Sequence, residues 1–467
     1  MVEGFLTAAH IDVTVDNVVV DVFKAPRVPE KVQAFMDAQE KWVRGRVARN
    51  NGRDPFFRQV GLLMKQYDGL RAGYAAQVPH VRARGNWAFQ LLNGVGDFFD
   101  IIPAVDRSSR VDWLKLSREE AEHLHARSTH CSALVKVTPD YSELLYGHSS
   151  WWRYSNTNRI MKHYRFAFSD PSTAAQEISF SSYPGYLESL DDFYMLGSGI
   201  GWTQTSLAVM NHSLYDDHVK PESLLAWQRV RVASAMAHTA PEWAETFAKE
   251  ASGTYSNQYM IIDFKLFEPK QPLPDDLFWV VEEVPGMVVA KDQTERLRQG
   301  YFSSYNIPFY PSVYDATGYP EMRAKHGTFW TFDLNVRAMQ FRRDQGKVRG
   351  LDGLKEILRY NDFEKDALSF DGQRQNPLYA ICSRGDLSDS GAASFGCYDT
   401  KVTNDRLVKN LQAEILNGPT RSHSLPTFSW SQFPKDRHEG LPQSYEFGFI
   451  STRPTAVGPS DAAQAEE

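Results

Sequence analysis

The stretch THCSALVKVTPDYSELLYGHSSWWRYSN, residues 129–156, begins with a cysteine placed at the head of a strand-like segment. The apolar run after Cys131 ends at a turn signal, Pro139 and Asp140, and a second apolar run then contains His148. This pattern predicts a β-hairpin that can bring Cys131 and His148 together. A thiol must lose its proton to attack a substrate, and imidazole is the usual local acceptor, so the pair is a candidate nucleophile and base. The alternative is a buried structural cysteine beside a hydrogen-bonded histidine.

A metal site is a second alternative, because several potential ligands precede and follow the same cysteine: His123, His125, His130, Cys131 and His148. The segment EEAEHLHARS has a helical pattern, and two histidines separated by one residue diverge on a helix. No second cysteine completes a CxxC pair, which structural zinc sites commonly use. Zinc therefore stays an alternative without a complete ligand set.

The composition excludes several classes of protein. The chain has 467 residues, of which 42% are hydrophobic and 13% aromatic, as in a folded globular protein rather than a disordered one. Its 51 basic and 58 acidic residues give a formal charge of −7, without a basic tract that would bind a phosphate backbone. We expect no nucleic-acid partner. We expect no transmembrane segment either, because no apolar run approaches the roughly 18 residues that a span needs.

The other two cysteines are Cys382 and Cys397, which close the short segment ICSRGDLSDSGAASFGCYD. This segment is rich in Gly, Ser and Asp, so a disulfide would form easily in an oxidising compartment. Two unpaired thiols are the alternative. In either case Cys131 has no obvious partner, and an unpaired cysteine needs an explanation.

The order of predicted elements indicates stacked sheets covered by helices rather than a parallel βαβ arrangement. Residues 3–23 alternate and are rich in β-branched side chains, which predicts a strand, and helices follow to about residue 130. Short strands dominate after Cys131, and two helices broken at Pro241 follow over residues 221–250. Later strands are predicted over residues 258–267 and 277–290, later helices over 351–363 and 404–418, and a disordered tail over 454–467.

Long segments of the chain resemble a known family. They occur in one order between EGFLTA and FGFISTRP, and they are CSALVKVTPDYSELLYGHSSWWRYSNTNRIMKHYRF, SSYPGYLESLDDFYML, SGTYSNQYMIIDFK, VVEEVPGMVVAKD, SSYNIPFYPSVYDATGYP, RYNDF and CYDTKVT. They are similar to the phospholipase B-like family, also called the lamina ancestor family, whose members have the N-terminal nucleophile hydrolase fold. The resemblance implies a four-layer αββα sandwich of two stacked antiparallel sheets between helical layers.

Members of that family cut themselves before the cysteine of the CSAL motif, so the resemblance implies cleavage between His130 and Cys131. The fragments would be residues 1–130 and 131–467, held together in one compact domain. The cut exposes an α-amino group whose reference pKa, about 7.7 to 8.0, suits it to act as the base for the thiol of Cys131.

The resemblance also implies roles for residues outside the junction. His148 and Trp151 match the GH..W motif of the pocket wall, and Asn306 in SSYNIP matches an oxyanion-hole donor. Arg337 in WTFDLNVRAMQF occupies the position of a pocket arginine, and Ser206 in WTQTS retains a hydroxyl where relatives often have threonine.

We therefore expect a hydrolase that cleaves acyl esters of glycerophospholipids through a thioester on Cys131, as a monomer or homodimer and without a cofactor. An amidase acting on N-acyl lipids or small peptides and a non-catalytic lipid-binding protein are the alternatives. Relatives are lysosomal or secreted, which suits a disulfide and a glycan at the sequon Asn211-His212-Ser213. The family has a signal peptide and a strand-bearing segment before EGFLTA, whereas Met1 lies close to that motif here, so we expect either a trimmed chain or a missing strand.

Overall fold

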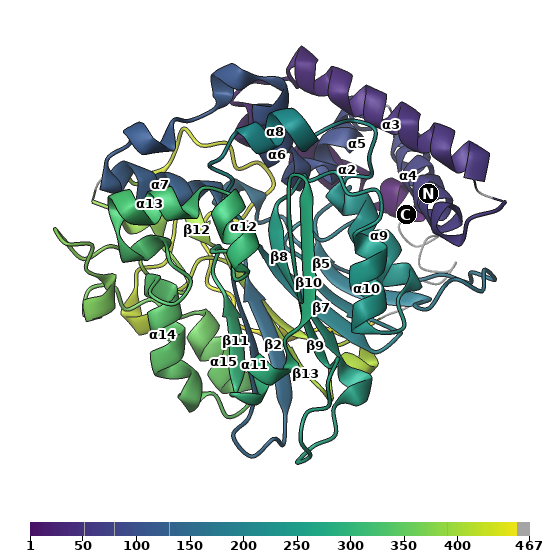
Figure 1. The fold of residues 1–467 in the computed structure, drawn as a ribbon. Coiled ribbons are helices and arrows are strands. Elements are labelled where there is room, and N and C mark those ends of the chain that lie inside the picture. The colour runs from purple at the N-terminus through teal and green to yellow at the C-terminus, as the bar shows by residue number, and fades with distance from the viewer. Residues whose placement is uncertain (51, 79, 130, 390, 455–467) are drawn as a thin grey trace.

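The computed structural model describes residues 1–50, 52–78, 80–129, 131–389 and 391–454. In these residues the chain forms two large antiparallel sheets (Figure 1). One sheet has the order β11(Tyr301–Ser304), β1(Ser132–Val137), β2(Leu144–Ser149), β13(Asp399–Asn404), β14(Glu414–Asn417), β15(Ile450–Ser451). The other has the order β10(Met287–Asp292), β9(Phe278–Val284), β8(Asn257–Asp263), β7(Ile200–Ser206), β6(Phe193–Leu196), β5(Glu177–Ser182), β4(Ile160–Arg165).

The two sheets are stacked, and helices cover their outer faces. Strand β7 contacts both β1 and β2, so these strands lie at the interface between the sheets. Successive side chains of a strand point to opposite faces, and β1 shows this directly. Val135 belongs to the buried cluster between the sheets, whereas Leu134 packs outward with Leu358 of α15(Leu351–Leu358). On the other sheet, Trp202 packs outward against Trp243 of α10(Ala240–Phe247). The predicted αββα sandwich is confirmed.

The N-terminal part of the chain is helical throughout, and the strand predicted over residues 3–23 is wrong. The helices are α1(Val2–Leu6), α2(Ala8–Phe23), α3(Glu30–Asn50), α4(Pro55–Ala75), α5(Asn86–Asn93), α6(Val95–Val105) and α7(Arg118–Ser128). In α2 the buried residues Ile11, Val15, Val18 and Val19 recur at helical spacing and enter the same cluster as the sheets. This one-sided burial outweighs the strand preference of β-branched side chains.

The helix predicted over residues 404–418 is also wrong. A single 3₁₀ turn, Val408–Asn410, is followed by β14, which pairs with β13 on one side and β15 on the other. Pairing with two neighbours satisfies the backbone of this segment, so tertiary contacts decide its conformation. The two helices predicted over residues 221–250 are confirmed as α9(Ala226–Met236) and α10, but the break lies before Pro241, which is in the first turn of α10. The helix within 351–363 is confirmed as α15.

The remaining elements are β3(Trp151–Arg153), β12(Phe395–Cys397), α8(Ser213–His218), α11(Thr294–Arg298), α12(Pro311–Ala316), α13(Tyr319–His326) and α14(Val336–Asp344). Each helix in the described ranges is too short or too polar to cross a bilayer. The tail predicted over 454–467 lies outside the described residues beyond Pro454.

Candidate active site

Cys131 lies between the end of α7 and the start of β1, at the edge of the space between the sheets. Its side chain is 2% exposed, and its φ of 89° is in the left-handed region, which a residue with a Cβ rarely adopts. Such a conformation costs about 1 to 3 kcal/mol and is found mainly at functional sites. Burial raises the pKa of the thiol, so the sulfur is protonated at neutral pH. His130, the other residue of the predicted cleavage junction, lies outside the described residues.

The predicted hairpin is present, and it places His148 near the start of β1. His148 on β2 pairs with Ala133 on β1 and with Lys401 on β13. The imidazole is fully buried, and in the described part of the chain neither of its ring nitrogens has a hydrogen-bond partner. Burial, followed by the charge of Lys401, holds the pKa of His148 well below its ordinary value. The ring is therefore neutral at physiological pH.

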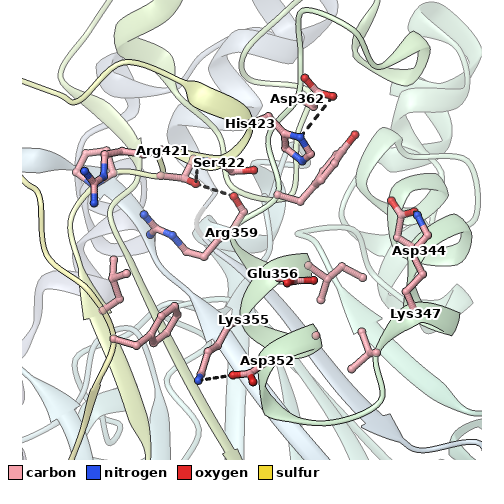
Figure 2. A pocket seen from close by; sticks show the side chains of 18 of the residues that line it. Asp344, Lys347, Asp352, Lys355, Glu356, Arg359, Asp362, Arg421, Ser422 and His423 are labelled. Atoms are coloured by element: carbon pink, nitrogen blue, oxygen red, sulfur yellow. Dashed lines mark hydrogen bonds and ion pairs between the residues drawn. The ribbon is translucent and has the colours of Figure 1, made fainter.

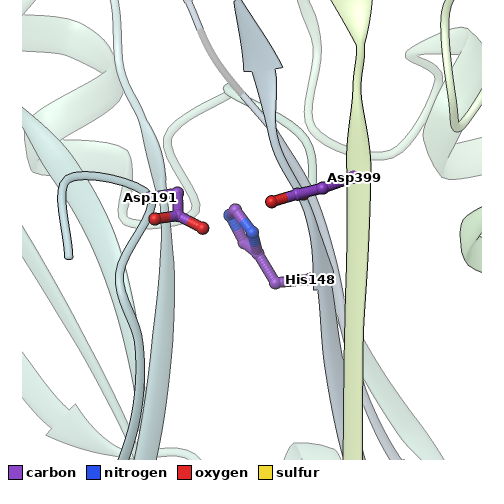
Figure 3. Close-up of side chains that lie close together, drawn as sticks. All are labelled: His148, Asp191 and Asp399. Atoms are coloured by element: carbon purple, nitrogen blue, oxygen red, sulfur yellow. The ribbon is translucent and has the colours of Figure 1, made fainter. Parts of the chain in front are cut away.

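Two carboxylates flank that imidazole, as Figure 3 shows: Asp191 before β6 and Asp399 on β13. The Lys401 ammonium lies 2.5 Å from Asp191 and 2.8 Å from Asp399. The Arg159 guanidinium lies 2.7 Å from Asp191 and 3.0 Å from Asp399. The two negative and two positive charges compensate one another inside the protein. We call these four residues and His148 the buried ion network.

The buried ion network is not arranged as a metal site, although His148, Asp191 and Asp399 offer ligand atoms within 4.8 Å of one another. Both carboxylates already bind an ammonium and a guanidinium group, so a cation would have to displace Lys401. Of the zinc ligands considered from the sequence, His125 packs in the buried side of α7 against Trp330, and burial lowers its pKa to about 3. In the described ranges Cys131 belongs to no group of three potential ligands.

Arg337, near the start of α14, connects the junction to β11. Its Nη1 donates to the carbonyl of Cys131 at 2.8 Å and to Ser132 Oγ at 3.2 Å. Its Nη2 donates to the carbonyl of Tyr305 at 2.7 Å and to Asn306 Oδ1 at 2.8 Å. The described residues place no carboxylate within ion-pair distance of this guanidinium. Burial lowers its pKa to about 9.

Asn306 and Ser206 join the ends of strands from the two sheets. Asn306 follows β11, is fully buried, and has a φ of 69°. Its Nδ2 donates to the carbonyl of Ser206, the last residue of β7, at 2.7 Å. Hydrogen bonds therefore link Cys131 through Arg337 and Asn306 to Ser206, and the assignment of these residues to one site stays a prediction.

Trp151, the first residue of β3, contacts Arg337. The Arg337 guanidinium lies over the Trp151 ring, 4.3 Å from its centre. Trp151 pairs with Cys397 of β12, and Cys397 forms a disulfide with Cys382. This confirms the predicted disulfide and places it directly beneath the tryptophan in a small buried cluster.

A cavity of about 290 Å³ lies beside the end of α7 and the end of β7. Ser128, at the end of α7, and Ser206 are part of its wall. Most of the other walls are apolar, with side chains from both sides of the junction: Phe98, Phe99, Ile102, Trp113, Leu207 and Val209. This cavity can accept an apolar group, although the Cys131 side chain is not part of its wall.

The sequence interpretation missed the partners of His148. Asp399 and Lys401 alternate on one strand, so the DTK pattern places an acid and a base on the same face. This alternation of an acid and a base was the available signal, in a segment for which no strand was predicted. Asp191 and Arg159 carry no local signal, because only the stacking of the sheets brings them to His148.

These features define a structural class: an αββα sandwich with a buried cysteine before an inner strand. The sequence model of the phospholipase B family matches residues 1–452. The chain is 41% identical over 454 residues to phospholipase-B 81 of Drysdalia coronoides and to phospholipase B-like 1 of Bos taurus, covering 97% of this chain and 81% of each relative. The chain belongs to the phospholipase B family.

Two solved structures are also similar to the chain. Penicillin V acylase from Agrobacterium tumefaciens is 8% identical with a TM-score of 0.34, covering 62% of this chain and 83% of the acylase. A mutant of the conjugated bile acid hydrolase from Clostridium perfringens is 11% identical with a TM-score of 0.37, covering 68% of this chain and 97% of the hydrolase.

Proposed function

We propose that the chain cuts its own backbone before Cys131 and then hydrolyses acyl esters of glycerophospholipids with that cysteine as an N-terminal nucleophile. The observation that carries the proposal is the state of Cys131. It is buried in a left-handed conformation before an inner strand, and Arg337 fixes its carbonyl. Fixing a strained residue in one orientation favours an attack of its thiol on the preceding peptide bond.

The cut proceeds by an acyl shift from nitrogen to sulfur. The Sγ of Cys131 attacks the carbonyl carbon of residue 130 and loses its proton, and the peptide C–N bond breaks as its nitrogen takes up a proton. Water then hydrolyses the thioester, leaving a carboxylate on residue 130 and a free α-amino group and thiol on Cys131. The new amine supplies a base that the buried, protonated thiol lacks before the cut.

The same atoms serve the second reaction. The α-amine accepts the thiol proton, Sγ attacks the ester carbonyl carbon, and the alcohol leaves with that proton. Water hydrolyses the acyl thioester and releases the fatty acid. We assign Asn306 Nδ2, held by Arg337, as a donor to the tetrahedral oxyanion, a role whose loss costs about 10² to 10³ in rate in other hydrolases.

His148 and Trp151 are assigned to the pocket wall, together with Ser206. The low pKa of His148 makes its imidazole a weak base, so we assign proton transfer to the α-amine. The role of His148 in catalysis is to keep a neutral polar surface between the two carboxylates and the nucleophile.

The fragments 1–130 and 131–467 stay together after the cut in this proposal, because buried contacts join them. Asp97 of α6 accepts from the backbone of Ala226 at 2.8 Å. Asp100 accepts from the backbone of Ser256 at 2.9 Å. Helices of the first fragment also share one buried cluster with both sheets.

A lipid acyl chain is supported by the mostly apolar cavity that reaches Ser128 and Ser206, and by the names of the relatives, which are phospholipases. An amidase acting on N-acyl lipids or small peptides is the second candidate, since one site can serve ester and amide chemistry on the same fold. A non-catalytic lipid-binding protein is the third.

A denaturing gel with N-terminal sequencing tests the cut. We expect two fragments, the larger beginning Cys-Ser-Ala-Leu, and one uncut chain for Cys131→Ala. Cys131→Ser retains an attacking oxygen and should cut slowly, which separates lost chemistry from lost folding. An active wild-type protein with an intact bond at this junction would falsify the mechanism.

Assays with matched ester and amide lipids test the substrate. Hydrolysis of the ester by the cut protein supports the phospholipase proposal, whereas turnover of the amide alone supports the amidase. A non-catalytic protein would bind both lipids equally before and after Cys131→Ala and turn over neither.

We also propose that the natural protein is lysosomal or secreted and carries a glycan on Asn211. The disulfide suits an oxidising compartment, and Asn211 is exposed. Protein from a secretory host should lose mass on treatment with an amidase that removes N-glycans, and Asn211→Gln should abolish that change. An unchanged mass in the wild type would reject glycosylation.

A further inference from the structure

A second cavity, of about 990 Å³, lies over the outer side of the six-stranded sheet. It is bordered by α15, by the segment 416–423 that follows β14, and by residues 445–449 before β15. None of the residues placed around Cys131 lines it. Figure 2 shows its charged side chains arranged around the opening. We call it the arginine cavity, after Arg359 and Arg421 in its wall.

Most charges on the helical side of the arginine cavity are already compensated. Lys355 binds Asp352 at 2.8 Å, and Lys347 binds Asp344 at 2.7 Å. On the far side, His423 lies 3.6 Å from Asp362. These pairs need no ligand to balance their charge.

Arg359 and Arg421 differ from these pairs. Across the described ranges, neither guanidinium has a carboxylate within ion-pair distance, and Arg359 Nη1 donates only to the carbonyl of Gly418, at 2.9 Å. Burial lowers the pKa of Arg359 to about 9, and the nearby charge of Arg421 acts in the same direction. Arg359 is partly buried and Arg421 is exposed, and both line the same cavity, so an anion bound there would lie near both cations.

The carboxylate with the largest effect on the pKa of Arg359, Asp399, is not available as a counter-ion for Arg359 and Arg421. Its charge raises the pKa of Arg359. Asp399 already binds Lys401 and Arg159 in the buried ion network. The cavity wall also carries the carboxylate of Glu356, which forms no ion pair with either arginine in the described ranges, so an anionic ligand can supply a counter-charge from the side of the cavity.

An aromatic surface continues from the two arginines. Tyr445, Phe447 and Phe449 line the same cavity, and Phe447 is 49% exposed. A large apolar side chain exposed beside unpaired cations suits a ligand that has an anionic and an apolar part. Ile450, the next residue along the chain, is 64% exposed and extends this surface.

We propose that the arginine cavity binds a phosphate ester, with its anionic oxygens on Arg359 and Arg421 and its apolar part against Phe447 and Phe449. The planar guanidinium matches phosphate oxygens with paired N–H donors. A phosphate monoester carries close to two negative charges at neutral pH and so balances both arginines, whereas one carboxylate balances a single arginine. This binding site lies apart from Cys131, and its existence does not depend on the proposed hydrolysis.

Calorimetry with two probes tests the site in the full-length protein. The probes are glycerol 3-phosphate and its di-O-hexyl ether, which keeps the phosphate ester but has no carboxylic ester to hydrolyse. We expect both to bind, the ether more tightly, and Arg421→Gln to weaken both about tenfold or more, since it removes a charge-assisted contact. Arg53→Gln changes an exposed arginine outside the cavity and should bind as the wild type does.

Two further variants separate the parts of the ligand. Arg359→Lys keeps the buried charge but loses the planar donor pair, so it should weaken both probes while thermal unfolding reports that the protein is folded. Phe447→Ser should weaken binding of the ether to the level of glycerol 3-phosphate and leave the binding of glycerol 3-phosphate unchanged. Equal binding of both probes to the wild type would support a free phosphate ester rather than a lipid head group. The proposal is overturned if neither probe binds, or if Arg421→Gln binds both as tightly as Arg53→Gln.

Discussion

Arg337→Lys is expected to slow self-cleavage strongly while the protein still folds. The guanidinium makes four hydrogen bonds, divided between the Cys131–Ser132 side and the Tyr305–Asn306 side. One ammonium cannot serve both sides, so about two bonds to a charged donor are lost. At about 1.5 kcal/mol for each, the free energy of unfolding falls by about 3 kcal/mol. A loss of similar size in the cleavage transition state slows the cut about 100-fold.

Cleavage can be followed after cell-free synthesis by the appearance of the two fragments on a denaturing gel. Unfolding is measured with urea in a Cys131→Ala background, so that the chain stays uncut. Arg343→Lys is the matched control, because Arg343 lies on the same helix and its guanidinium binds Asp344 and Asp366. It should lose stability but cut at the wild-type rate. If folded Arg337→Lys also cuts at the wild-type rate, the contact with the Cys131 carbonyl has no role in the reaction.

Three other predictions concern stability. Replacing Cys382 and Cys397 together by serine should lower the free energy of unfolding by about 3 kcal/mol, the value for a disulfide that closes a loop of about 15 residues. An unchanged urea midpoint would contradict this prediction. Burial raises the pKa of Asp100 and of Glu282 to about 7. Their protonated carboxyl groups therefore contribute fully to the free energy of unfolding below about pH 4, and this contribution is lost as the pH rises through 7. The urea midpoint should be higher at pH 5 than at pH 7.5, and Asp100→Asn should narrow this difference; the same difference in both proteins would refute the assignment. Lys401→Met leaves two buried carboxylates short of a partner and should cost about 3 to 5 kcal/mol, and a loss below 1 kcal/mol would contradict the ion network.

The fold was predictable where the signal is local. The run after Cys131 and the run containing His148 are separated by Pro139 and Asp140, and they form the β1–β2 hairpin. The αββα arrangement followed from the order of such runs and from the family resemblance. Strand pairing within a hairpin depends on residues close in sequence, so a turn signal and two apolar runs suffice to predict it.

Two segments were assigned to the wrong element because local preference and tertiary packing disagree there. Residues 8–23 are rich in valine, yet one face of α2 is buried against the rest of the domain, and the helix buries that face as a strand could not. Residues 414–417 have a helical apolar pattern, yet they lie between β13 and β15. Intrinsic helix or strand propensity predicts secondary structure only weakly. In these two segments, contacts with residues distant in sequence determine the conformation instead.

The residues of the candidate site fall into two groups: those whose proximity follows from local sequence, and those that only the assembled fold brings together. Cys131, His148 and Trp151 lie within one hairpin and its extension, so their proximity could be inferred from spacing. Asp191 and Asp399 lie on segments from different parts of the chain, and they meet only because the two sheets stack. The environment of His148 therefore depends on the assembled fold: buried and flanked by compensated charges, it stays neutral, which a sequence motif cannot specify. The motif predicts which residues lie near Cys131, and the packing of the sheets determines the protonation state of His148.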